Sequence, residues 1–434
     1  MKKSILLIGY NYYPEPTGIG KYSGEQINWL AKKGYDCTVI TSYPYYPYWK
    51  VQEPYLRDRY RYKKEMQYYN SGGKVTIHRC PMFVPAKPSG LKRMLLDLSF
   101  IIAAFIQILP LLFKKKFDFI IAVSPSFLIG LLGLLCKQFT KAKILYHVHD
   151  LQIEAARDLG MLKAPGLINK LFKIERYIIN SCDFITCVGE GMAQKTREKT
   201  HKEVSLFLNA TDLTQFYPIK DRARLKESFG FNPTDKIILY SGAIGEKQGI
   251  ENILHAANKF VQTSNMKFVI CGSGPYKEKL QLLAEDLKLN NVIFFPLQPI
   301  EKFNQFLNMA DLHLVVQKAN AGDLVMPSKL TTVLAIGGLA LVTANKGSSM
   351  YSLIKQYNMG VLVEAENRQQ LFDGIEVAIN KDLSYMSRNA RLYSEKYLSI
   401  DKIMSNFEES YMLPGPYEAR PVFENENTTI PLPA

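Results

Sequence analysis

Short apolar segments alternate with helical segments along this chain, and this pattern limits the possible folds more than any other feature of the sequence. The first half contains segments typical of buried strands at Ser4–Gly9, Cys37–Thr41, Phe119–Val123, Ile144–His147 and Phe184–Val188. Strands that are apolar on both faces are typical of a parallel sheet that helices cover on both sides. The sequence therefore predicts an α/β domain in this half.

The same pattern restarts after a polar stretch that contains two prolines. Further strands are expected at Lys236–Ser241, Lys267–Cys271, Val292–Phe295, Leu312–Val316 and Leu339–Thr343. This repetition predicts two consecutive α/β domains. We expect a first domain at residues 1–212, a second at 213–398, a helix at 399–413 that crosses back to the first domain, and an extended or disordered tail at 414–434.

The chain has 434 residues and a formal net charge of +14, which favours a polyanionic partner. Nucleic acid is one such partner, but the sequence contains no recognition helix, zinc site or RNA-binding signature, so we expect no nucleic-acid binding. Anionic lipids and phosphorylated small molecules are the other candidates. The six cysteines are scattered without a C-x-x-C pair, which is typical of buried thiols in a reducing compartment.

The segment Leu95–Phe113 is almost entirely apolar, and its length is near the lower limit for a membrane-spanning helix. Lys92 and Arg93 precede it and Lys114–Lys116 follow it, so the flanking charges give no one-way topology. A span would also divide the first domain. We therefore favour a buried or membrane-surface helix over a true span, and the basic flanks favour contact with an anionic membrane surface.

Three glycine-rich loops come directly after expected strands and before expected helices. Their residues are Gly18, Ile19 and Gly20 in the first loop, Gly242, Gly245 and Lys247 in the second, and Gly272 and Gly274 in the third. Glycines at such positions let backbone N–H groups approach an anion at the positive end of a helix. Each loop alone is equally compatible with a plain tight turn, but the three together predict a phosphate-binding site.

His147, His149 and Asp150 lie within four consecutive residues at the end of a buried strand of the first domain. Strand alternation places the two histidines on one face. Polar residues at the carboxyl end of a strand suit a substrate site better than a core, so we take all three as candidate catalytic residues. A core or helix-capping role for Asp150 is the alternative. No third metal ligand lies nearby and no D-x-D motif occurs, so no metal is expected.

With these motifs, the chain resembles the retaining, family-4 glycosyltransferases of the GT-B fold. It is most similar to their bacterial branch for colanic acid and O-antigen, which includes fucosyl and N-acetylfucosaminyl transferases. The resemblance covers about Lys3 to Met412 and rests on residues 5–47, 147–160, 241–254 and 323–338. It implies two Rossmann-like domains that face each other across a cleft, the first on the acceptor and membrane side and the second binding a nucleotide sugar.

The resemblance also implies roles for individual residues. The loop Gly18–Gly20 would approach the donor, His147–Asp150 would line the sugar and acceptor side, and Lys247 would hold the diphosphate. The family carries an arginine a few residues before that lysine, where this chain has Ala243 and Ile244. Further donor contacts are implied for Gly242, Gly245, Gly272, Gly274, Leu297, Asp323, Ser328, Lys329 and Thr332.

The activity implied is that of a hexosyl or N-acetylaminosugar transferase in the assembly of O-antigen, capsule or exopolysaccharide. Its donor would be a nucleotide-diphosphate sugar and its acceptor a polyprenyl-diphosphate-linked or other glycan, with no cofactor. The enzyme would be peripheral on the inner face of the bacterial cytoplasmic membrane. A nucleotide-sugar epimerase or hydrolase with the same fold is the alternative, although a soluble enzyme of that kind has no need of the apolar, basic-flanked segment.

Overall fold

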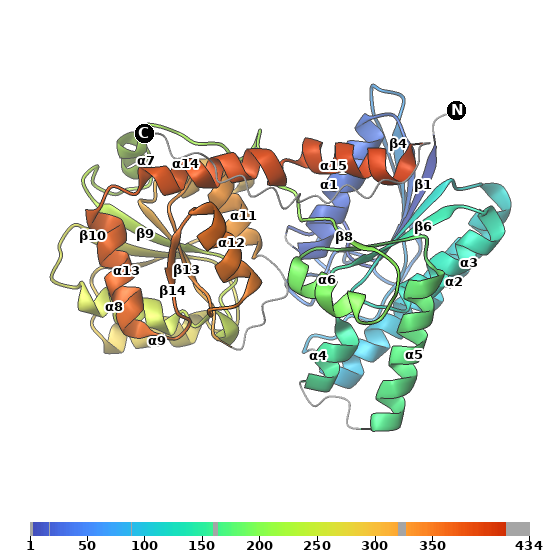
Figure 1. The fold of residues 1–434 in the computed structure, drawn as a ribbon, viewed down its shortest axis with the longest axis horizontal. Helices are drawn as coiled ribbons and strands as arrows, with labels where there is room; N and C mark the ends of the chain where they lie inside the picture. The colour runs from blue at the N-terminus through green and yellow to red at the C-terminus, as the bar shows by residue number, and fades with distance from the viewer. Residues whose placement is uncertain (1–2, 17, 88, 159–163, 320–326, 414–434) are drawn as a thin grey trace. The chain divides into compact units, whose positions relative to one another are not determined.

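A computed structural model describes residues 3–16, 18–87, 89–158, 164–319 and 327–413. Their contacts divide the chain into two compact units, each built on one sheet (Figure 1). The first unit contains the chain up to Asn209 together with the described residues from Ile403 on. The second unit runs from Ala210 to Lys402. Two parallel-sheet α/β domains, as the sequence predicts, are therefore confirmed.

The sheet of the first unit has the strand order β3-β4-β2-β1-β5-β6-β7-β8 in the described part of the chain. Its strands are β1 (Ser4–Ile8), β2 (Asp36–Thr41), β3 (Lys63–Tyr68), β4 (Lys74–Arg79), β5 (Phe119–Val123), β6 (Lys143–Val148), β7 (Phe184–Cys187) and β8 (Val204–Leu206). The helices are α1 (Gly18–Lys32), α2 (Gly90–Lys114), α3 (Ile129–Thr140), α4 (Gln152–Asp158), α5 (Pro165–Ser181) and α6 (Glu190–Arg197).

Strand β3 is the element of this sheet that departs from the parallel pattern. It pairs antiparallel with β4, whereas the other neighbouring strands pair in parallel. Most of its side chains are exposed, because it forms the edge of the sheet. Sequence analysis did not predict β3, since a charged edge strand lacks the continuous apolar run that marks β5, which is buried at every residue.

The second unit has the strand order β11-β10-β9-β12-β13-β14, with parallel pairing between neighbours. Its strands are β9 (Lys236–Ser241), β10 (Met266–Cys271), β11 (Val292–Phe295), β12 (Leu312–Val315), β13 (Ala340–Thr343) and β14 (Val361–Val363). The helices are α7 (Arg222–Ser228), η1 (Glu246–Gln248), α8 (Glu251–Lys259), α9 (Lys277–Asp286), α10 (Ile300–Asn308), α11 (Ser328–Ala335), α12 (Ser349–Tyr357), α13 (Arg368–Asn380), α14 (Ser384–Tyr393) and η2 (Ser394–Leu398).

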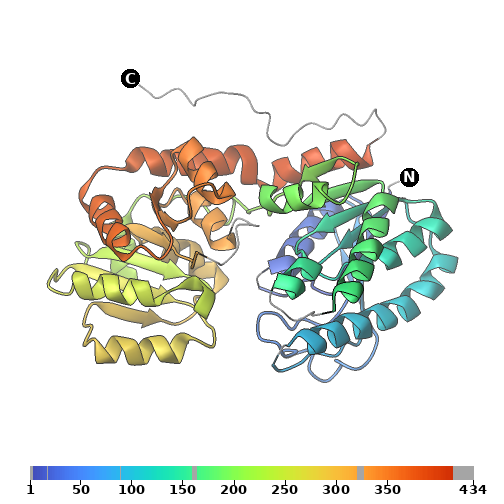
Figure 2. The same cartoon turned by 60° about the horizontal axis from the view of Figure 1, so that its bottom comes forward.

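Side chains of β9 alternate between two apolar cores, one on each face of the second sheet. Ile238 and Tyr240 pack into the core beneath α8, α9 and α13. Ile237 and Leu239 pack into the opposite core, beneath α10 and the end of α11. Figure 2 shows helices on both sides of each sheet. The sheet is thus buried on both faces, which explains why its strands are apolar at nearly every position.

Both sheets reverse their strand order at one point, and this point positions the site. The order runs outward from β1 and β5 in the first unit, and from β9 and β12 in the second. The connections that leave neighbouring strands at such a point go to opposite faces, and ligands bind in the crevice beyond the carboxyl ends of these strands. The loops that follow these four strands are therefore where functional residues are expected.

Helix α2 has an apolar side buried in the first unit and an apolar side exposed. Leu96, Phe100, Ala104 and Ile108 are buried, and the ring of Phe100 meets that of Tyr10 edge-on at 5.5 Å. By length and composition this helix could cross a membrane. No other helix in the described residues is both long enough and apolar enough to do so. Its first residue is Gly90, earlier than the apolar segment marked in the sequence.

The last described helices end on the first unit. They are α15 (Ile400–Phe407) and η3 (Glu408–Met412), a π-helical turn. The ring of Phe407 lies 6.0 Å from Phe119 and stacks at 4.9 Å on Phe207. The hydroxyl of Tyr35 donates to a carboxylate oxygen of Glu408 at 2.5 Å. These contacts attach the end of the chain to the core of the first unit.

Candidate active site

Two glycine loops of the second unit meet at the carboxyl edge of its sheet. The backbone N–H of Gly242, after β9, donates to the carbonyl of Cys271 at 3.0 Å, and that of Ile244 donates to Ser273 at 2.8 Å. A Cβ atom on Gly272 would lie 1.9 Å from the carbonyl oxygen of Gly242, so only glycine permits this approach. The loops that sequence analysis marked as phosphate-binding candidates are therefore in contact with each other.

Lys247 lies in the short helix η1, which continues the first of these loops towards α8. Its side chain is exposed, and its carbonyl accepts a hydrogen bond of 3.0 Å from the N–H of Lys318. The ammonium of Lys318 in turn pairs with Glu251 in the first turn of α8, at 3.2 Å. Gly245 donates its N–H to the side-chain oxygen of Gln248 at 3.1 Å. Lys247 thus places a cation beside the positive end of α8, an arrangement that favours the binding of an anion.

Lys329 lies in the first turn of α11 and points beneath the Gly242 loop. Its ammonium nitrogen is buried, although part of its stem is exposed, and lies 4.1 Å from the centre of the Tyr240 ring. The hydroxyl of Tyr240 donates to the carbonyl of Ala243 at 2.6 Å and so holds the loop. Burial lowers the pKa of Lys329 to about 7. A lysine amine with such a pKa takes up a proton, and so gains its charge, when an anion approaches.

The remaining residues predicted to contact the donor differ in their exposure. Thr332 is buried, and its hydroxyl donates to the carbonyl of Ser328 at 3.1 Å, within α11. Ser328 is exposed at the start of that helix, and Leu297, in the loop after β11, is 55% exposed. Asp323 lies outside the described residues. The described residues of this set therefore lie after β11 and in α11.

In the first unit, the loop after β1 is held by a carboxylate that sequence analysis missed. Glu15 is only 2% exposed and accepts hydrogen bonds from the N–H groups of Tyr45 at 3.2 Å and Tyr46 at 3.1 Å. The side-chain amide of Asn11 donates to it at 2.9 Å. A Cβ on Gly20 would lie 2.3 Å from a carboxylate oxygen of Glu15, so the glycine makes room for this group. A single glutamate between two prolines carried no signal in the sequence.

The two other members of the predicted Gly18–Gly20 loop are half-buried at the start of α1. Gly18 has a φ of +66°, a left-handed conformation that favours glycine. A Cβ at this position would lie 3.4 Å from the ring of Tyr46. Ile19 follows it in the first turn of the helix. The glycines thus serve both the turn and the packing on the Tyr45–Tyr46 segment.

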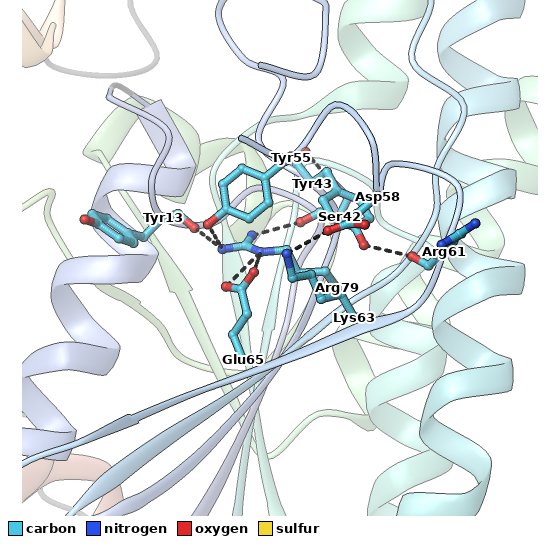
Figure 3. A network of polar contacts seen from close by, with 9 residues as sticks. All are labelled: Tyr13, Ser42, Tyr43, Tyr55, Asp58, Arg61, Lys63, Glu65 and Arg79. Carbon is cyan, nitrogen blue, oxygen red and sulfur yellow. Dashed lines mark hydrogen bonds and ion pairs between the residues drawn. The ribbon is translucent and has the colours of Figure 1, made fainter. Parts of the chain in front are cut away.

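Arg79, the last residue of β4, connects this loop to the neighbouring strands (Figure 3). Its buried guanidinium donates to the carboxylate of Glu65 at 3.1 Å, to the carbonyl of Ser42 at 3.2 Å and to the carbonyl of Tyr13 at 2.9 Å. It also lies 4.7 Å from the centre of the Tyr55 ring. One buried cation therefore holds the segments that follow β1 and β2, which is a structural role and not a ligand-binding one.

The histidine pair lies at the end of β6, as predicted, but His147 does not open onto a site. It is fully buried, its Nδ1 is 2.9 Å from the hydroxyl of Thr186, and its ring lies 5.0 Å from that of Phe207. Strand β6 pairs with β5 and β7 at this residue, so the sheet covers it, and a catalytic role for His147 stays a prediction. Burial lowers the pKa of His147 to about 3, so it is neutral.

His149 and Asp150 lie nearer to the surface. His149 is half-buried, its ring is 4.3 Å from that of His147, and its N–H donates to the hydroxyl of Ser124 at 2.9 Å. Burial and the neighbouring His147 lower the pKa of His149 well below its usual range. Asp150 is exposed. The loops after β5 and β6 therefore meet here, and Asp150 is the candidate catalytic residue of this segment that is open to a ligand.

A second carboxylate missed by sequence analysis links α2 to the same edge. Asp97, on the buried side of α2, accepts a hydrogen bond of 2.5 Å from the side chain of Gln152, two residues after Asp150. Burial raises the pKa of Asp97 to about 6, although the hydrogen bond from Gln152 by itself lowers it. Asp97 is the one charged residue within the apolar segment Leu95–Phe113. An isolated charge in such a segment could have identified it as a candidate functional residue.

The second unit provides backbone N–H groups, helix N-termini and lysines at the carboxyl edge of its sheet. The first unit has Asp150 and neutral imidazoles at the carboxyl edge of its own sheet. The described residues contain no group of three or more His, Cys, Asp or Glu side chains that could hold a metal ion. Cations and helix dipoles can stabilise the negative charge of a departing phosphate group. This edge of the second unit is thus suited to a phosphorylated leaving group.

Glu15 makes a testable contribution to the pH dependence of stability. Burial raises its pKa from 4.5 to about 7, so the folded chain keeps a proton that the unfolded chain loses near pH 4.5. The stability due to this proton is complete below pH 4.5 and is lost as the pH rises towards 7. Between pH 5 and 8, the free energy of unfolding should therefore fall about 1–3 kcal/mol further in the wild type than in Glu15→Gln.

Urea unfolding at several pH values measures this difference. Glu278→Gln, which changes an exposed glutamate of α9, is the matched control and should follow the wild type. Parallel pH curves for the wild type and Glu15→Gln would show that Glu15 does not hold the proton.

Comparison with known proteins shows glycosyltransferase sequences in both units. Residues 17–204 match the model of the glycosyl transferase 4-like domain, and residues 221–395 match that of glycosyl transferases group 1. The chain is 36% identical over 414 residues to WcaI of Escherichia coli K12, a glycosyl transferase assigned to colanic acid biosynthesis. That match covers 93% of this chain and 98% of the relative.

Solved structures share the fold of both units. Sucrose-phosphate synthase from Thermosynechococcus elongatus aligns with a TM-score of 0.70 at 15% identity, over 94% of this chain and 98% of that one. HepE from Anabaena, in complex with UDP and glucose, aligns with a TM-score of 0.66 at 11% identity and the same coverage. These likenesses confirm the GT-B fold. The full-length match at 36% identity shows the family: this chain belongs to the group 1 glycosyltransferases and is a glycosyltransferase.

Proposed function

We propose that this enzyme transfers a sugar from a nucleotide-diphosphate donor to a polyprenyl-diphosphate-linked or other glycan acceptor, with retention of the anomeric configuration. The reaction takes place at the inner face of the bacterial cytoplasmic membrane, and the product is a surface polysaccharide such as O-antigen, capsule or exopolysaccharide. The E. coli relative assigned to colanic acid biosynthesis supports this role, because the two chains match along nearly their whole lengths.

The observation that carries the donor side of the proposal is the glycine-lined edge of the second unit. The loops at Gly242 and Gly272 meet there, beside Lys247 and the positive end of α8. The bond to the sugar breaks as negative charge develops on the diphosphate, and these groups stabilise that charge without a metal. The fold shared with a protein that binds UDP and glucose supports the same class of donor.

Front-side departure of the diphosphate through an oxocarbenium-like state accounts for retention without a nucleophile. The acceptor hydroxyl then attacks from the face that the diphosphate leaves, and a phosphate oxygen of the departing group takes its proton. The part of the chain that contributes to this step is the pair of loops after β5 and β6. Asp150 is exposed there, and the neutral ring of His149 lies behind it.

The observation that supports a membrane-bound acceptor is the exposed side of α2, which we call the apolar face. Its residues are large, apolar and exposed, and they recur at helical spacing: Leu91, Met94, Leu95, Leu98, Ile102, Phe105, Ile106, Leu109 and Phe113. Phe113 is 77% exposed and meets Phe139 of α3, itself 54% exposed, at 6.2 Å. A continuous apolar surface of this kind is typical of proteins that bind a membrane interface.

Cations lie at both ends of the apolar face. Lys92 and Arg93 are exposed at the start of α2, and Lys114 and Lys116 at its end. Lys115 differs from our expectation, because it turns inward and pairs with Asp36 at 2.9 Å. Lysines and arginines close to a membrane surface each contribute about 1 kcal/mol of attraction to anionic lipids. The face therefore combines apolar contact with attraction to anionic head groups.

Replacement of Lys247 tests the donor side. Lys247→Ala should lower transfer about 100- to 1000-fold, because it removes the exposed cation beside the leaving diphosphate. Transfer of labelled sugar to a membrane extract measures this loss. Lys259→Ala, which changes an exposed lysine at the end of α8, should retain full activity. Wild-type turnover in a folded Lys247→Ala protein would remove the phosphate-binding role.

Charge introduced into the apolar face tests the membrane side. The double variant Ile102→Glu/Ile106→Glu should bind vesicles of phosphatidylethanolamine and phosphatidylglycerol at least tenfold more weakly, because two side chains that would enter the membrane become charged. Flotation with vesicles measures binding. Leu282→Glu places the same charge on α9, at a residue that is 56% exposed, and should bind as the wild type does. Equal flotation of all three proteins would contradict membrane docking through α2.

A further inference from the structure

The loop before Lys247 lacks the second cation that the family resemblance implies. Ala243 and Ile244 stand at the positions where an arginine is expected. Ile244 is fully buried in the core beneath α8, and its carbonyl oxygen lies 2.1 Å from where a Cβ on Gly274 would be. No side chain at position 244 can therefore turn to meet a ligand. A second cation for this edge has to come from another element.

Lys329 reaches the same loop from α11. Its ammonium nitrogen lies 3.7 Å, and its Cε 3.6 Å, from the place that a Cβ on Gly242 would occupy. A side chain at position 242 would therefore lie in contact with the end of Lys329. The loop that begins at Gly242 follows β9, and helix α11, which begins at Ser328, comes after β12. The strand order reverses between β9 and β12. Lys329 therefore lies at the point where ligands of such sheets bind.

The ammonium of Lys329 has no acceptor among the residues that the structure describes, although its nitrogen is buried. The ammonium nitrogen lies over the face of the Tyr240 ring, 4.1 Å from its centre. A buried cation without an anionic partner costs free energy, and such groups are normally paired. Lys318, which also lies near this loop, already pairs with Glu251. A buried cation beneath a glycine loop, with no anionic partner among the described residues, points to an anion that arrives from outside.

We propose that Lys329 is the second diphosphate-binding cation of this enzyme, in place of the missing arginine, and that it takes up a proton from solvent when the diphosphate binds. The proposal rests on the proposed donor class and adds the residue that distinguishes this chain from the family pattern. Lys247 approaches the diphosphate from the solvent side, and Lys329 approaches it from beneath the Gly242 loop.

Proton uptake follows from the surroundings of Lys329. Burial lowers its pKa to about 7, and no carboxylate among the described residues pairs with it. The titratable group that faces it is the phenol of Tyr240, whose pKa is raised by burial and which stays neutral. The charged groups around the adjoining loop are Lys247 and the pair Lys318–Glu251. Above pH 7 the free amine is therefore largely neutral, and a bound diphosphate draws a proton to it.

Calorimetric titration of the full-length protein with UDP and with GDP tests this proposal. Measurements in buffers of different ionisation enthalpy give the number of protons taken up on binding. In the wild type, uptake should rise between pH 6 and 8 towards one proton, and affinity should fall as the pH rises above 7. Lys329→Gln should bind tenfold to hundredfold more weakly and lose this proton, while Lys259→Gln should behave as the wild type does. Protonation of the nucleotide itself is common to all the proteins and cancels in the comparison.

The outcomes separate this proposal from the proposed function. Nucleotide binding in which Lys329→Gln matches the wild type in affinity and in proton uptake would overturn the role of Lys329 and leave the donor class intact. Failure of the wild type to bind either nucleotide would overturn the donor class itself. If Lys329→Gln does not fold, the wild type alone decides: proton uptake that stays at the value for the nucleotide alone from pH 6 to 8 would refute the proposal.

Discussion

The second domain depends on the backbone contact between the loops that follow β9 and β10. The carbonyl of Gly242 comes so close to Gly272 that any Cβ at position 272 would lie 1.9 Å from it. This contact turns the first loop inward, which places Ile244 in the core and Gly242 next to the end of Lys329. Backbone N–H groups, a helix N-terminus and two lysines are thereby brought to one edge of the sheet, where an anion can be bound without a metal.

The first domain holds its own loops through two buried polar side chains, Arg79 and Glu15. Arg79 binds the carbonyls of Tyr13 and Ser42 and the carboxylate of Glu65 (Figure 3). Glu15 binds the backbone of Tyr45 and Tyr46. Loss of a partner from the buried guanidinium of Arg79, or of the hydrogen bonds that the buried Glu15 accepts, is unfavourable, so both side chains restrict the loops. The rigid loops lie at the same sheet edge as Asp150. Glu15 and Arg79 therefore fix the loops at this edge of the first sheet.

The sequence predicted the parts of this structure that depend on continuous apolar runs or on glycine. Strands such as β5 and β9 and the loops at Gly242 and Gly272 were found in this way. The edge strand β3 was missed, because its exposed residues leave no apolar pattern. The burial of His147 and of Lys329 could not be foreseen either, since both depend on which strands and loops become neighbours in space. Donor base, sugar and acceptor are encoded in side-chain contacts of this kind.

The central claim is that a nucleoside diphosphate binds at the carboxyl edge of the second sheet. Hydrogen exchange of the full-length protein, measured by mass spectrometry with and without UDP or GDP, tests it most directly. The account predicts slower exchange in peptides that cover Gly242–Gly249, Gly272–Gly274 and Ser328–Thr332 when one of these nucleotides is present. Unchanged exchange in all three segments at a saturating nucleotide concentration, or protection confined to the opposite edge of the sheet, would contradict it.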